Sequence, residues 1–131
     1  MNDINIGPIN KSYRMTMFEG ETNLYMLQQG WRALRYYGKR ARQAVEHGDV
    51  QTKAQMIARA DELLNVMSGV LDTTENAKLG QALMTIYSAL RYTLFRANTS
   101  NSLDALRDYD VALSLLDQDL ARPAESTKAS P

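Results

Sequence analysis

The stretch from Leu79 to Asn98 constrains the fold more than any other part of the chain. Its apolar residues recur at spacings of three and four, which places them on one stripe of an α-helix. The stripe consists of Leu79, Leu83, Ile86, Leu90, Leu94 and Ala97. Met84 and Phe95, with Tyr92 nearby, fall on roughly the opposite side. A helix that is apolar on two sides either lies deep in a core or offers one side to a partner.

Three further segments show the same helical period. Together with 79–98, helices are predicted at about 22–47, 50–71 and 103–120. Turn and capping sequences separate them, namely Gly48-Asp49, Asp72-Thr73-Thr74 and the run from Asn98 to Ser102. No segment shows the alternating β-branched pattern of a strand. The sequence therefore predicts an all-α protein, an antiparallel up-and-down four-helix bundle with a short N-terminal helical segment.

The two ends of the chain differ from the predicted bundle. Pro8 can open a short helix in which Ile9, Tyr13 and Met17 recur four apart. The last residues have no apolar anchor. We expect a lead or cap segment over 1–20, a helical bundle over 21–121 and a disordered tail over 122–131. The lead segment either caps the bundle or acts as a displaceable flap over a binding groove.

Charge and cysteine content narrow the class of protein. Lys plus Arg and Asp plus Glu number 15 each, and this balance disfavours nucleic-acid binding. The chain has no cysteine, so it has neither disulfide bonds nor a thiolate site. The N-terminus lacks the pattern of a signal peptide, and no apolar run is long enough to span a membrane. A cytoplasmic protein without stable membrane insertion is expected.

The sequence offers no pattern for catalysis or metal binding. The single histidine, His47, lies at a predicted helix end, where it cannot complete a Glu-x-x-His metal site or activate a serine. Glycine-rich phosphate loops are absent, and the carboxylates are scattered. We therefore expect a binding protein that has no enzymatic activity, no metal and no cofactor.

Two groups of residues lie off the predicted core. The first is basic and belongs to the first long helix: Arg32, Arg35, Lys39, Arg40 and Arg42. It forms either a solvated face or a surface for an acidic partner. The second group includes Met26, Tyr37, Met84 and Phe95, drawn from a chain with seven Met and seven Tyr. Such residues suit a surface that adapts to a partner helix, or they complete a broad core.

Several short motifs follow one another in a recognisable order. They are Gly48-Asp49 before the second helix, the Met67 to Asp72 ending, Leu83 with Ile86 and Tyr87, and the closing Ala97-Asn98. In order and spacing, the chain from about Leu24 to Leu120 resembles the FliS-type flagellin export chaperones. The resemblance implies a cytoplasmic bundle that binds the disordered C-terminal segment of flagellin. Members prevent premature polymerisation and assist delivery to the flagellar type III export apparatus.

The resemblance also implies a client-binding surface on the outside of the bundle. Its residues in this chain are Tyr13, Met84, Tyr87, Tyr92, Phe95, Val111 and Leu115. Tyr13 resembles the family's N-terminal tyrosine, whose segment covers the binding surface or contacts a component of the export gate. Monomer and weak homodimer both stay open.

The chain departs from the family pattern at Gln28-Gln29-Gly30, at Trp31, and in lacking a tryptophan after the last helix. These departures leave open a flagellin variant or another exported subunit as the client. The alternative function is that of a structural or regulatory bundle that acts by self-association.

Overall fold

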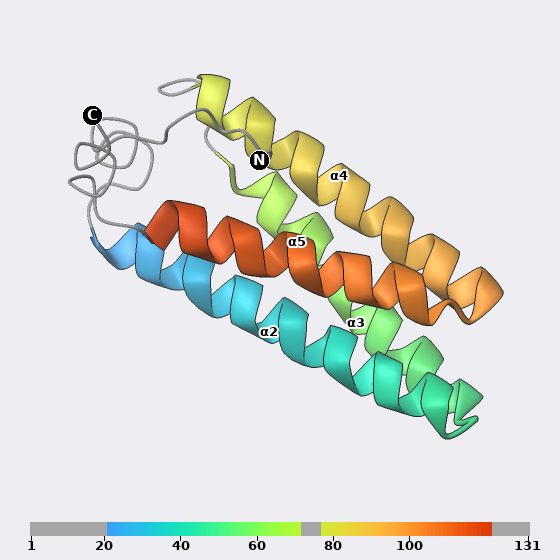
Figure 1. Ribbon diagram of the computed structural model, residues 1–131. Coiled ribbons are helices and arrows are strands. Elements are labelled where there is room, and N and C mark those ends of the chain that lie inside the picture. The colour runs from blue at the N-terminus through green and yellow to red at the C-terminus, as the bar shows by residue number, and fades with distance from the viewer. Residues whose placement is uncertain (1–20, 72–76, 122–131) are drawn as a thin grey trace, which may run out of the picture.

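The structure is a computed structural model that describes residues 21–71 and 77–121. It contains four helices, α2 (Glu21–Glu46), α3 (Val50–Gly69), α4 (Ala77–Ser100) and α5 (Leu103–Ala121). Figure 1 shows them packed side by side as an antiparallel bundle, and the described part of the chain contains no strand. The predicted all-α four-helix fold is confirmed. The predictions for the N-terminal lead and the C-terminal tail lie outside the described residues.

The helices are arranged around the bundle in chain order. α2 packs against α3 and α5, and α4 packs against the same two helices. α2 therefore lies diagonally opposite α4 (Figure 1). Each short connection reverses the chain, which is the geometry expected of an up-and-down bundle.

Capping residues set the two described turns. Gly48 has a φ of 71°, a left-handed conformation that glycine adopts readily after a helix. The Asp49 carboxylate then accepts hydrogen bonds from the backbone N–H of Thr52 at 3.0 Å and from its hydroxyl at 2.7 Å. At the second turn, the Ser102 hydroxyl oxygen accepts from the backbone N–H of Ala105 at 3.0 Å. These N-caps explain why α3 and α5 begin where the sequence predicts.

The core contains three fully buried aromatic side chains, and two of them have a polar atom that bonds across the bundle. The Trp31 indole N–H on α2 donates to the Tyr87 hydroxyl on α4, over 3.1 Å. The Tyr109 hydroxyl on α5 donates to the backbone oxygen of Leu34 on α2, over 3.0 Å. Buried polar atoms are costly unless paired, so these two bonds favour one relative placement of α2, α4 and α5.

Two glycines of α2 allow close approach of neighbouring helices. A Cβ atom at Gly38 would lie 2.7 Å from Cε2 of the Tyr109 ring. A Cβ atom at Gly30 would lie 2.7 Å from the terminal methyl of Met67 on α3. Both distances are shorter than van der Waals contact, so α2 depends on glycine to pack against α5 and α3. The sequence prediction of close approach at these two positions is confirmed.

Lys53 is the buried charged residue of the bundle. Its Nζ donates to the backbone oxygen of Asn98 at 2.9 Å and to Oδ1 of Asn101 at 2.5 Å. Asn101 has a φ of 51°, in the left-handed region that asparagine tolerates better than most residues. The ammonium group thus ties the start of α3 to the C-terminal end of α4, where a positive charge is favourable.

Stability at alkaline pH should depend on the buried phenols. Burial raises the pKa of Tyr87 from 10.0 to about 12, although its hydrogen bond from Trp31 acts in the opposite direction. Burial and the Asp110 charge also raise the pKa of Tyr109. Because the folded protein holds these protons more tightly than the unfolded chain, the stability they contribute is full below pH 10 and is lost above it. Tyr87 alone should remove about 3 kcal/mol of unfolding free energy between pH 10 and 12.

Urea unfolding followed by circular dichroism at several pH values between 8 and 12 measures this loss. The Tyr87→Phe variant is the control, since it removes one titrating group and should flatten the alkaline decline. At pH 7 the same variant should cost about 1–3 kcal/mol, because the Trp31 N–H is left buried without its partner. An alkaline decline that is the same in both proteins would contradict this assignment.

Candidate protein-binding surface

α4 exposes a set of large apolar side chains on the side away from the core. Tyr92 and Phe95 are each 63% exposed and Met84 is 42% exposed, whereas Leu83, Leu90 and Leu94 are buried. The predicted separation of α4 into a core stripe and a second apolar set is confirmed for these residues. Exposed aromatic and Met side chains are typical of protein-binding surfaces.

An ion pair shows which neighbour this set borders. Arg91 lies seven residues after Met84 and four before Phe95, so the three side chains share one face of α4. The Arg91 guanidinium binds both oxygens of Asp61 on α3, at 2.8 and 3.1 Å, and donates to Oδ1 of Asn65 at 3.2 Å. Its hydrogen bond to Asp61 raises the pKa of Arg91, which stays charged. Met84 and Phe95 therefore flank this ion pair along the α3 edge of α4.

The outer face of α5 contributes a second, smaller apolar pair. Val111 is 56% exposed and Leu115 is 46% exposed, and their spacing of four residues puts them on one face of the helix. This face is opposite the buried residues Leu106, Tyr109 and Leu113. We call the five exposed side chains the α4/α5 surface; its members are Met84, Tyr92, Phe95, Val111 and Leu115.

The sequence analysis placed Tyr87 on the outer surface, and that placement is wrong. Tyr87 is 0% exposed and its hydroxyl pairs with Trp31 in the middle of the bundle. It lies four residues after Leu83 and three before Leu90, so it belongs to the same buried stripe. Ile86, which was assigned to that stripe, is only partly buried. Tyr13, the other predicted residue, lies outside the described residues.

A further apolar cluster was missed as a surface by sequence reasoning. The contact between Gly30 and Met67 brings Met26, one turn earlier in α2, near Val70 and Val66 at the end of α3. Met26, Val66 and Val70 are all exposed. Sequence periodicity marked Met26 as off the core but placed Val70 beside it. Val70 is exposed because α3 ends at Gly69, one residue before it.

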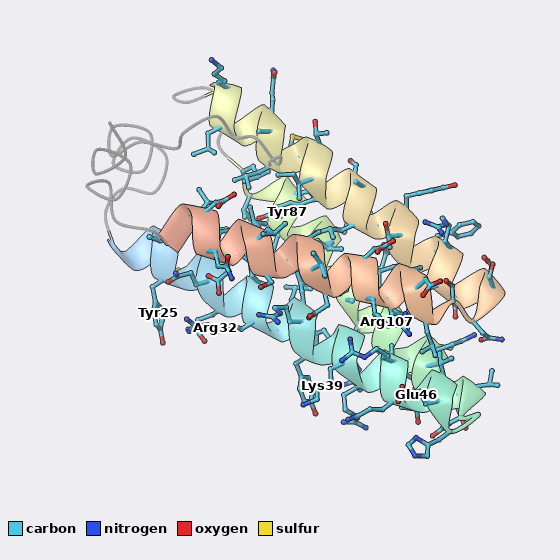
Figure 2. All side chains as sticks on the ribbon, in the orientation of Figure 1. Tyr25, Arg32, Lys39, Glu46, Tyr87 and Arg107 are labelled. Carbon is cyan, nitrogen blue, oxygen red and sulfur yellow. The ribbon has the colours of Figure 1, made fainter. Side chains whose placement is uncertain are left out.

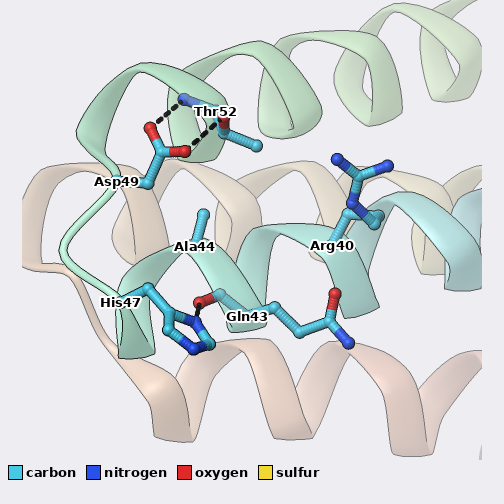
Figure 3. A pocket seen from close by; sticks show the side chains of 6 residues that line it. All are labelled: Arg40, Gln43, Ala44, His47, Asp49 and Thr52. Carbon is cyan, nitrogen blue, oxygen red and sulfur yellow. Dashed lines mark hydrogen bonds between the residues drawn. The ribbon is translucent and has the colours of Figure 1, made fainter.

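A shallow polar hollow lies at the α2–α3 turn (Figure 3) and is lined by Arg40, Gln43, Ala44, His47, Asp49 and Thr52. Local interactions already engage its polar groups. The His47 ring Nδ1 donates to the Gln43 carbonyl at 2.8 Å, and Arg40 donates to the Tyr36 hydroxyl at 2.9 Å. Hydrogen bonds from Thr52 lower the pKa of the Asp49 carboxyl, which is fully used as a helix cap. This arrangement is that of a helix-capping turn.

Two searches of the described residues bear on other site classes. No group of three or more His, Asp or Glu side chains within 21–71 and 77–121 is placed to hold a metal ion. None of the four described helices combines the length and the hydrophobicity that crossing a bilayer requires.

Comparison with known proteins assigns the chain to a family. The family model for flagellar protein FliS matches residues 8–119, which is most of the chain. A search of curated proteins found no match. The matched region contains all four helices except the last two residues of α5, and it contains every residue of the α4/α5 surface. The chain therefore belongs to the FliS family and is a flagellar export chaperone.

Proposed function

We propose that this chain binds the disordered C-terminal segment of flagellin in the cytoplasm, prevents its premature polymerisation and assists its delivery to the flagellar type III export apparatus. The observation that supports this most is the α4/α5 surface. A member of an export-chaperone family exposes five apolar side chains on helices whose opposite faces already form a complete core. These side chains add nothing to the core and are available to a client.

The energetics suit a client that must be released. Covering a large apolar side chain contributes about 1.5–3 kcal/mol when its burial is complete. A disordered client loses conformational entropy when it is ordered on the chaperone, and this loss offsets part of the gain. Affinity therefore stays moderate while the assembly-prone apolar residues of the client are shielded from other copies. The binding step needs no bond chemistry, metal or cofactor.

The positions of the exposed residues suggest how the client lies. Met84 and Phe95 border α3, whereas Val111 and Leu115 occupy the outer face of α5. A single straight helix cannot follow both lines. The client therefore wraps the bundle as separate apolar stretches, one along the α3 edge of α4 and one across α5.

A flagellin assembly assay tests the proposal. Monomeric flagellin of the same cell is induced to form filaments, and light scattering is followed with and without this protein. We expect an equimolar amount to suppress filament growth. The Val66→Asp variant, changed on α3 outside the α4/α5 surface, should suppress it equally well. Unchanged filament growth, together with self-association of this protein alone, would instead support the structural or regulatory bundle.

A further inference from the structure

The outer face of α2 carries an exposed stripe of alternating aromatic and basic side chains. Tyr25, Arg32, Tyr36 and Lys39 are separated by seven, four and three residues, so they share one face of the helix. Tyr25 is 59% and Tyr36 is 52% exposed, and Arg32 and Lys39 are exposed as well. Figure 2 shows Tyr25, Arg32 and Lys39 projecting from one side of α2, away from α5. We call these four residues the α2 stripe.

The positive charge of α2 is not neutralised within the bundle. α2 contains five basic residues, and its two acidic residues, Glu21 and Glu46, stand at its ends. Among the described residues, Arg35 is the member of this basic set that forms an ion pair, with Asp110 at 2.9 Å. Basic residues also recur at helical contact spacing, as in Arg32 with Arg35 and Lys39 with Arg42. Such like-charge pairs slightly destabilise a helix, so the arrangement is unfavourable for folding alone.

The aromatic members support a binding role over a merely solvated face. The Arg40 guanidinium lies 5.8 Å from the centroid of the Tyr36 ring and donates to its hydroxyl. This contact holds a large, partly apolar ring beside cationic groups in solvent. Tyr and Arg are the residue types that contribute most to protein interfaces, because they offer contact area together with hydrogen bonds.

We propose that the α2 stripe is a docking surface for an acidic segment of a partner protein. Arg32 and Lys39 are seven residues apart, about 10 Å along the helix axis. Two carboxylates with that separation can pair with both, and they occur at i and i+7 of a helix or at i and i+3 of an extended strand. An apolar side chain between them lies against Tyr36. The partner segment is thus acidic and amphipathic.

The location of the stripe separates this partner from the proposed client. α2 lies diagonally opposite α4, whose exposed apolar residues face the other side of the bundle. The docking surface therefore goes beyond the proposed function, and its test does not depend on flagellin binding. An acidic protein segment is favoured over nucleic acid because the whole chain is balanced in charge and Glu21 and Glu46 limit the stripe at both ends.

Fluorescence anisotropy with the full-length protein tests the proposal. The probe is a fluorescein-labelled 15-residue helical peptide with glutamates seven residues apart and phenylalanine between them. We expect saturable binding that weakens when salt is raised and when both glutamates are replaced by glutamine. The Arg32→Glu/Lys39→Glu variant should bind at least tenfold more weakly. Arg59→Glu/Lys78→Glu, an equal charge change at exposed sites on α3 and α4, should bind as the unmodified protein does.

Three results would overturn the proposal. The unmodified protein could fail to bind the peptide at millimolar concentration, or the Arg32→Glu/Lys39→Glu variant could bind it with unchanged affinity while retaining its circular dichroism spectrum. A labelled 15-nucleotide thymidine oligomer could also bind to the stripe more tightly than the peptide, which would assign the stripe to nucleic acid.

Discussion

Replacing Phe95 by aspartate should weaken client binding at least tenfold while leaving the bundle folded. Phe95 is largely exposed and flanks the Arg91–Asp61 ion pair, so it contributes little to the core. Truncating an interface anchor costs about 2 kcal/mol or more, and each 1.4 kcal/mol corresponds to a factor of ten in affinity. The Tyr92→Asp/Phe95→Asp double variant should therefore lose on the order of 100-fold.

The measurement has two parts, affinity for the flagellin C-terminal segment and thermal unfolding of the free protein. Exposed substitutions usually change stability by less than about 0.5 kcal/mol, so the melting temperature of the Phe95→Asp variant should stay nearly constant. Val66→Asp places the same charge on α3 and should keep full affinity. A large fall in melting temperature would place Phe95 in the core and remove it from the binding surface.

The second large effect is expected at Gly38, where α2 meets α5. A leucine there would place its Cβ 2.7 Å from the Tyr109 ring, which cannot move without losing its hydrogen bond to the Leu34 carbonyl. Overpacking costs about 1–3 kcal/mol and loss of a buried hydrogen bond about 1–3 kcal/mol more. We expect Gly38→Leu to destabilise the protein by roughly 2–5 kcal/mol, or to prevent folding.

Two other glycine variants calibrate this result in urea unfolding experiments. Gly30→Ala meets only the flexible end of Met67, so its cost should be smaller. A Cβ at Gly69 meets no atom within 4 Å, and Gly69→Ala should be neutral or slightly stabilising. A Gly38→Leu protein as stable as the Gly69→Ala protein would show that α2 and α5 do not pack as closely as described.

The helices could be predicted closely from sequence because their signals are local. The apolar period and the turn residues predicted helices at about 22–47, 50–71, 79–98 and 103–120. The structure places their ends within two residues of those bounds. Local patterns also identified the exposed Met84 and Phe95.

The finer assignments depended on contacts between helices, which a single period does not specify. Ile86 and Tyr87 are neighbours in sequence, and either could have continued the apolar stripe. The choice of Tyr87 depends on Trp31 from α2, whose indole N–H gives the buried hydroxyl a partner. Lys53 is buried for a similar reason, since the end of α4 supplies oxygen atoms for its ammonium group. Such pairings become visible only when the helices are placed together.

Calorimetric titration of this protein with the C-terminal segment of flagellin tests the central claim most directly. Wrapping a disordered segment over the α4/α5 surface should give saturable one-to-one binding with a large negative heat-capacity change. Under the same conditions the Tyr92→Asp/Phe95→Asp protein should give little or no heat. Absence of binding to every flagellin of the same cell, or binding that the double variant leaves unchanged, would contradict the assignment of this surface to flagellin.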